Sequence, residues 1–230
     1  MEQQKVKATE QNTLSADEAL LRLKEGAARF REASHSQGDV SPALRRRTCD
    51  LGQNPYAVIL TCSDSRVLPE AIFSVGIGEL FVIRVAGNTV DRHQLGTVEY
   101  AIEHLGCKLV VVLGHTHCGA VDAALNHEPG GYIKFFVNEI KQAIGDETDE
   151  ERACFLNAQH SAACIEQALL TDEPDRAADV RVVTALYHLG SGRVEFEQGV
   201  QSSCHPQLVT FASPAFEYHV LERRRHFERP

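Results

Sequence analysis

The sequence predicts an α/β fold in a single domain, with a mostly parallel β-sheet flanked by helices. Two short apolar runs rich in β-branched residues, 56–61 and 109–113, have the composition of strands buried on both faces, as in a parallel sheet. A helical pattern separates these runs, and strand and helix patterns also alternate elsewhere in the chain. With 230 residues the chain fits one such domain and can bury a substantial core.

Composition divides the chain into three parts. We expect the polar residues 1–14 to be disordered, residues 15–197 to form the folded domain, and residues 198–230 to be a C-terminal extension with an arginine-rich end.

The elements of the domain follow from hydrophobic periodicity and from the positions of turn residues. Ser15 and Glu18 predict a capping box for the first helix, and Gly106 predicts the C-cap of a later one. The β-α-β alternation predicts right-handed crossovers. The expected helices are 15–33, 69–73, 95–105, one opening at 118, 133–144 and 150–170; the expected strands are 56–62, 80–85, 109–113, 181–188 and 193–196; residues 34–54 form a connector with one short helix.

Charge and cysteine usage limit the partners and the compartment. The formal net charge of −9 argues against a general nucleic-acid or anionic-membrane binder. The sequence shows neither the apolar core of a signal peptide nor an apolar stretch of roughly 18 residues that could span a membrane. Seven scattered cysteines do not form a secreted-type disulfide framework, so we expect a reducing cytoplasm in which thiols stay free to bind metal.

Three candidate metal ligands follow the two core runs. Cys62 ends the first predicted strand, and His115 and Cys118 come directly after the strand 109–113. Neighbouring parallel strands would bring the three side chains together at their carboxyl ends, where open α/β sheets place their sites. Two thiolates and one imidazole suit zinc and leave one coordination position for chemistry. The alternative is that the cysteines are small core residues and the histidine is a hydrogen-bonded core residue.

Asp64 and Arg66 stand beside these ligands, two positions apart, where an extended segment would let them form a carboxylate–guanidinium pair. Next to a metal, the aspartate would either accept a hydrogen bond from zinc-bound hydroxide or become a fourth ligand that closes the site. Arg66 would decide between these roles by holding the carboxylate away. The alternative is a structural ion pair at a strand end.

At this point the sequence resembles the β-class carbonic anhydrases. Cys-Ser-Asp-Ser-Arg at 62–66 and Gly-His-Thr-His-Cys-Gly-Ala-Val at 114–121 are similar to the two signature segments of that family. The resemblance extends over roughly residues 15–197. Its other supporting segments are Gly-Gln-Asn-Pro at 52–55, Phe-Val-Ile-Arg-Val-Ala-Gly-Asn at 81–88, Val-Glu-Tyr-Ala at 98–101 and Gly-Arg-Val-Glu-Phe at 192–196.

The resemblance implies a β-carbonic anhydrase-like zinc domain that hydrates CO2 reversibly to bicarbonate and a proton by attack of zinc-bound hydroxide. It implies one zinc ion per subunit and self-association as a dimer or tetramer, with part of each site supplied by the neighbouring subunit. The chain has no tryptophan, so the bicarbonate-inhibition site of some relatives cannot be complete. The implied residues are Cys62, His115 and Cys118 as zinc ligands, Asp64 and Arg66 as the gate, Gln53, Phe81, Ala86, Tyr100 and Gly119 at the CO2 pocket, and His104 as candidate proton shuttle.

Three other functions stay open on the sequence. A hydrolase of carbonyl sulfide or carbon disulfide would use the same fold with a different pocket wall. A thiol enzyme would use Cys118 as nucleophile with His115 or His117 as base. A non-catalytic zinc-binding module would need the metal but not Asp64.

Overall fold

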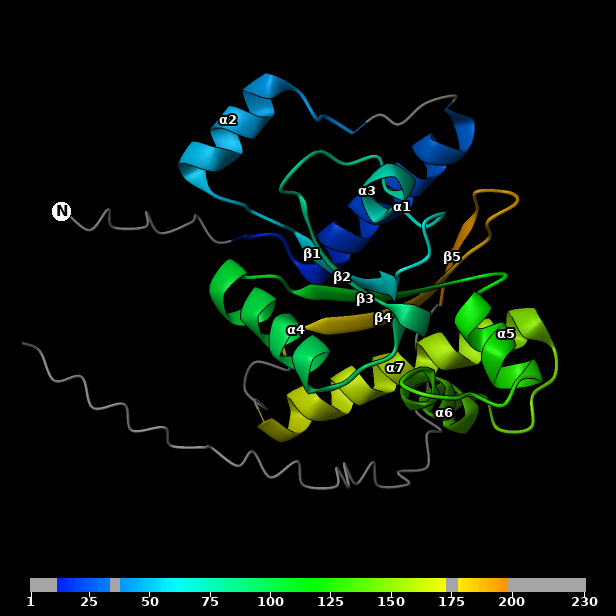
Figure 1. Ribbon diagram of the computed structural model, residues 1–230. Helices are drawn as coiled ribbons and strands as arrows, with labels where there is room; N and C mark the ends of the chain where they lie inside the picture. Colours follow the sequence, from blue (N-terminus) through cyan, green and yellow to red (C-terminus); the bar gives the residue numbers. More distant parts are fainter. Residues whose placement is uncertain (1–11, 34–37, 173–177, 198–230) are drawn as a thin grey trace, which may run out of the picture. The chain divides into compact units, whose positions relative to one another are not determined.

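The described residues form one mixed sheet with the strand order β2–β1–β3–β4–β5 (Figure 1). The computed structural model describes residues 12–33, 38–172 and 178–197. The strands are β1 (Ala57–Cys62), β2 (Leu80–Val85), β3 (Leu109–His115), β4 (Arg181–Tyr187) and β5 (Val194–Phe196). Strands β1 to β4 run parallel to one another, and β5 runs antiparallel to β4. The predicted α/β class with a mostly parallel sheet is confirmed.

Alternate residues of the central strands build two cores on opposite faces of this sheet. Ile59 packs with α1 (Ala16–Glu32) and α3 (Pro69–Ile72) on one face. Val58 and Leu60 pack with α4 (Arg92–Leu105) and α7 (Glu150–Asp172) on the other. Every residue of β1 and β3 is buried, which explains why both strands read as continuous apolar runs.

A third core lies at the carboxyl ends of the strands. There α5 (Gly119–Asn126), α6 (Ile133–Ile144) and the start of α7 enclose an apolar cluster that contains Cys62 and Cys118. The short turn η1 (Ala86–Asn88), which follows β2, also packs against these helices. The connector before β1 contains the expected single helix, α2 (Pro42–Leu51).

Several predicted boundaries are confirmed and two need correction. Ser15 and Glu18 form the capping box of α1, and Gly106 ends α4 in the left-handed region. However, α4 begins at Arg92 rather than at residue 95, because Asp91 caps it and Gln94 completes a second capping box. Strand β3 continues to His115 rather than ending at residue 113, since its last residues pair with the end of β4.

The two terminal predictions fall largely on residues that the structure does not describe. Residues 1–11 and 198–230 lie outside the described residues, so the disordered N-terminus and the C-terminal extension stay predictions. At the near end of the domain, the backbone N–H of Asn12 donates to the carbonyl of Leu105. Among the described residues, no helix has both the length and the apolar character that crossing a membrane requires.

Candidate metal centre

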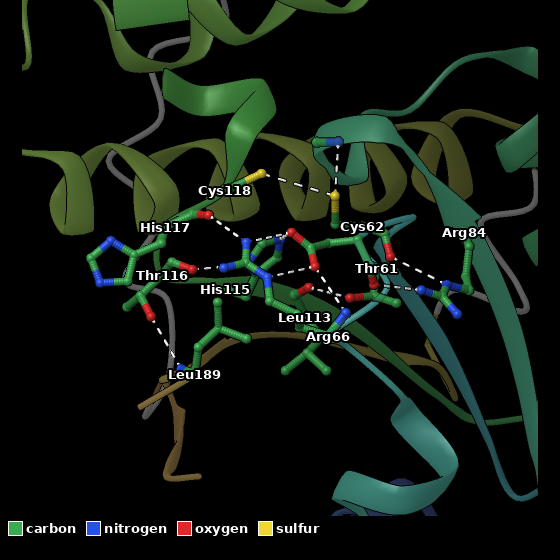
Figure 2. Close-up of polar contacts among 12 residues, drawn as sticks. Thr61, Cys62, Arg66, Arg84, Leu113, His115, Thr116, His117, Cys118 and Leu189 are labelled. Carbon is green, nitrogen blue, oxygen red and sulfur yellow. Dashed lines mark hydrogen bonds and ion pairs between the residues drawn. The ribbon is translucent and has the colours of Figure 1, made fainter. Parts of the chain in front are cut away.

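Three side chains from two neighbouring strands and one helix start meet at the carboxyl end of the sheet. Cys62 ends β1, His115 ends β3 and Cys118 is the N-cap of α5. Because β1 and β3 are adjacent and parallel, with Thr61 opposite Leu113, their ends lie side by side. One ligand atom from each of the three residues lies within 4.8 Å of the others, and all three residues are buried (Figure 2).

His115 presents a free nitrogen lone pair to this cluster. Its Nδ1 lies 2.9 Å from the carbonyl oxygen of Thr116, which can only accept, so Nδ1 carries the proton. The opposite nitrogen, Nε2, is buried and has no hydrogen-bond partner among the described residues. A buried, unpartnered acceptor is costly unless something binds it, and a second hydrogen bond that fixes the tautomer is typical of metal-ligating histidines.

The two sulfurs lie 3.9 Å apart, and the backbone N–H of Gly87 donates to Cys62 Sγ at 3.3 Å. The hydrogen bond between the sulfurs lowers the pKa of Cys62 and raises that of Cys118, because the thiol that keeps its proton donates it to the other. Even without metal, the pair therefore favours one thiolate. Zinc binds both sulfurs as thiolates. The positive charge of the ion would stabilise the thiolate of Cys118, which the hydrogen bond between the sulfurs disfavours.

Asp64 borders the cluster but is held by Arg66. The guanidinium donates from Nε to Oδ1 at 2.9 Å and from one terminal nitrogen to Oδ2 at 2.6 Å, and that nitrogen also donates to the carbonyl of His117 at 2.9 Å. These hydrogen bonds hold the pKa of Asp64 far below its usual range. Oδ2 of Asp64 lies 4.0 Å from Nε2 of His115, so the carboxylate borders the cluster while each of its oxygens accepts a hydrogen bond from Arg66.

This donor set fits zinc. Two sulfurs and a neutral imidazole nitrogen are ligands that zinc prefers, and three protein ligands are typical of sites that keep a position open. No other described group of three histidine, cysteine or acidic side chains has a comparable arrangement.

The residues predicted for the CO2 pocket divide between two places. Gly119 follows Cys118 as the first residue of α5, and Ala86 precedes the Gly87 that contacts Cys62. In contrast, Phe81 pairs with Val58 at the far end of β2, roughly 13 Å along the strand from Val85, which lies opposite Cys62.

Tyr100 and His104 lie beside Phe81 rather than beside the candidate metal ligands. The Phe81 and Tyr100 rings are 6.0 Å apart, and those of Tyr100 and His104 are 5.0 Å apart. Tyr100 and His104 are both exposed, as is Gln53, which follows α2. Within one protomer, Phe81, Tyr100 and His104 thus form an aromatic group of their own rather than the wall of the cluster.

Two residues that contribute to the site, Gly87 and Asn157, are not predicted as site residues from the sequence. The sequence marks Gly87 only as part of the family-like segment 81–88, although its backbone N–H donates to a candidate ligand sulfur. Asn157 of α7 was not singled out, although its side-chain amide donates to the carbonyl of Gly87 at 2.7 Å. His117, between the ligands, is exposed and lies 3.4 Å from Glu150, so it points away from the cluster (Figure 2).

Comparison with known proteins adds an independent line of evidence. The sequence profile described as carbonic anhydrase matches residues 57–194. A carbonic anhydrase of Mycolicibacterium smegmatis is 36% identical over 187 residues, which cover 75% of this chain and 89% of that protein. A tetrameric β-carbonic anhydrase of Sordaria macrospora superimposes with a TM-score of 0.60 at 25% identity, covering 69% of this chain and 88% of that one. The β-carbonic anhydrase CcaA gives a TM-score of 0.58 at 26% identity, covering 78% and 95%.

Proposed function

This chain belongs to the carbonic anhydrase family, in its β class, and we propose on that basis that it hydrates CO2 reversibly to bicarbonate and a proton with one zinc ion per subunit. Cys62, His115 and Cys118 would hold the zinc. The observation that carries the proposal is the free lone pair of His115 Nε2, buried beside two sulfurs that are themselves 3.9 Å apart.

Each nearby group has a defined role in this reaction. Zinc bound by the three residues supplies the Lewis acidity that makes water a nucleophile for CO2 near neutral pH. Thr116 keeps His115 in the tautomer that can bind, and the two thiolates cancel the formal charge of the metal. Asp64, ionised and held by Arg66, would accept a hydrogen bond from the attacking water through the remaining lone pair of Oδ2, and so would orient the oxygen of that water toward CO2.

The pocket wall is proposed to form between subunits. Gln53, Phe81 and Tyr100 lie away from the cluster of their own protomer, and a neighbouring subunit would bring them to it. The Sordaria macrospora relative is tetrameric, which supports self-association of this chain. The proton-shuttle role of His104 and the cytoplasmic location stay predictions.

Stopped-flow CO2 hydration, measured across pH on protein of known zinc content, tests the proposal. Two thiolates leave the metal less positive than three neutral imidazoles do, so the bound water should be less acidic than the pKa of about 7 in the three-histidine enzyme. We expect activity to rise on the alkaline side of neutrality and to scale with zinc. A flat profile from mild acid upward would contradict this reasoning.

Three further measurements separate the alternatives. Faster turnover of carbonyl sulfide or carbon disulfide than of CO2 would identify a sulfur-substrate hydrolase. Metal-independent activity that alkylation abolishes would identify a thiol enzyme. Asp64→Asn should keep zinc while cutting turnover, and unchanged turnover would remove Asp64 from the mechanism.

A further inference from the structure

The backbone N–H of Gly87 donates to the proposed zinc thiolate of Cys62, and its direction depends on an unusual backbone conformation. Gly87 has φ +65°, which places it in the left-handed region that favours glycine. A Cβ at this position would lie 2.6 Å from Cδ1 of Ile140 and 3.0 Å from Cβ of Ala120. Helices α5 and α6 therefore press on Gly87 from outside, but apolar contacts of this kind do not set the direction of its hydrogen bonds.

Asn157 of α7 supplies the directional contact. Its Nδ2 donates to the Gly87 carbonyl at 2.7 Å, inside the protein, and the side chain is 1% exposed. One hydrogen bond thus holds the carbonyl of Gly87 while the N–H of the same residue donates to Cys62 Sγ at 3.3 Å. The chain of contacts runs from α7 through a single glycine to a metal ligand.

The apolar surroundings of Asn157 argue against a role in which its side chain only fills space. The neighbouring buried residues of α7 are small and weakly polar, namely Ala153, Cys154 and Ala158. An amide in such a position costs free energy unless its hydrogen bonds are made, and an apolar residue of similar size would avoid that cost.

We propose that Asn157 is a positioning residue of the zinc centre, which holds the Gly87 N–H on the Cys62 thiolate and thereby sets how strongly that sulfur donates to the metal. A hydrogen bond to a thiolate withdraws negative charge from the sulfur and weakens its donation to the ion. Loss of the Asn157 contact frees the turn at Gly87, and the sulfur then keeps more of its charge. This inference rests on the zinc site proposed above but does not depend on CO2 being the substrate.

The test replaces Asn157 with Leu, which keeps the branched shape and the number of side-chain heavy atoms and removes the donor. Ser161→Ala is the matched control, because Ser161 lies one turn further along the same helix and is equally buried. The readouts are zinc affinity, measured by chelator competition, and the sulfur-to-metal charge-transfer band of the cobalt-substituted protein. We expect Asn157→Leu to shift the band to lower energy, because the sulfur keeps more of its charge. We also expect it to bind zinc about 10-fold more weakly, because the freed turn at Gly87 no longer holds Cys62 in place and this loss of preorganisation outweighs the stronger donation. Ser161→Ala should match the parent in both.

A band and an affinity that do not change in Asn157→Leu would overturn the proposal. Failure of the unaltered protein to bind cobalt or zinc at all would instead contradict the proposed metal site itself, so the two failures can be told apart.

A second measurement uses the unaltered protein, so it does not require that any variant folds. In the unaltered protein loaded with 113Cd, a proton of a hydrogen bond to a ligating sulfur shows scalar coupling to the metal in NMR spectra. We expect this coupling for the amide proton of Gly87, together with slow exchange of that amide with solvent. Its absence in protein with stoichiometric cadmium would overturn the link between Gly87 and Cys62 and, with it, the role of Asn157.

Discussion

Replacing Arg66 with Ala should move Asp64 onto the metal and close the site. Oδ2 of Asp64 already lies 4.0 Å from Nε2 of His115. Two ligand atoms on a tetrahedral zinc ion are roughly 3.4 Å apart when their bonds to it are about 2.0–2.1 Å long. The carboxylate therefore needs to move by well under an ångström relative to His115, and the side chain of Arg66 is what opposes this movement.

The size of the effect follows from the contacts that are lost. Arg66 donates two charge-assisted hydrogen bonds to Asp64, of 2.9 and 2.6 Å. Each such bond contributes about 1.5–3 kcal/mol when shielded. The Arg66 side chain is 53% exposed, so solvent screening reduces the total to about 2 kcal/mol. That free energy corresponds to a shift of about 30-fold in the equilibrium between the open and the Asp64-ligated centre.

The assay combines metal spectroscopy with turnover. Cobalt-substituted Arg66→Ala should show more of the four-ligand form with Asp64 bound than the parent at the same pH, and slower CO2 hydration at unchanged metal content. Arg66→Lys, which keeps the charge but loses the two-pronged geometry, should fall between the two. If Arg66→Ala keeps the parent's spectrum and rate, the backbone N–H of Arg66, which donates to Oδ1 at 2.9 Å, is sufficient and the gate hypothesis is wrong.

Three other perturbations have defined outcomes. His115→Ala should lose zinc and activity together, as metal analysis after desalting would show; retained stoichiometric zinc would contradict its role as a ligand. Gly87→Ala should lower the free energy of unfolding in urea by about 2–4 kcal/mol, from left-handed strain and the contact with Ile140, whereas Gly96→Ala in open space on α4 should be neutral or stabilising. Burial raises the pKa of Cys107 to about 12, so the folded state keeps a proton that the unfolded chain loses; stability should fall between about pH 9 and 12, and less steeply in Cys107→Ala.

The sequence predicts the position of the candidate metal centre because the signal lies in side chains and in strand order. Buried parallel strands read as apolar runs, and the residues after them must meet if the strands are neighbours, as β1 and β3 are. The start of α4 was missed because its capping box, from Asp91 to Gln94, precedes the first apolar residue of the helical pattern. Hydrophobic periodicity detects the face of a helix that packs, and the solvated first turn lies outside that pattern.

The hydrogen bonds around the two sulfurs cannot be predicted from the sequence, for a different physical reason. Every residue except proline has a backbone N–H. The sequence around Gly87 therefore does not indicate that this particular N–H points at Cys62. Asn157 lies 70 positions from its acceptor, on a helix whose neighbouring buried residues are small, and only the packing of α7 against the turn at Ala86–Asn88 joins them. Ligand identity is thus encoded locally at two strand ends, whereas the hydrogen bonds that tune the ligands are set by tertiary packing. Variation at position 157 can therefore change the metal's chemistry while both signature segments stay intact.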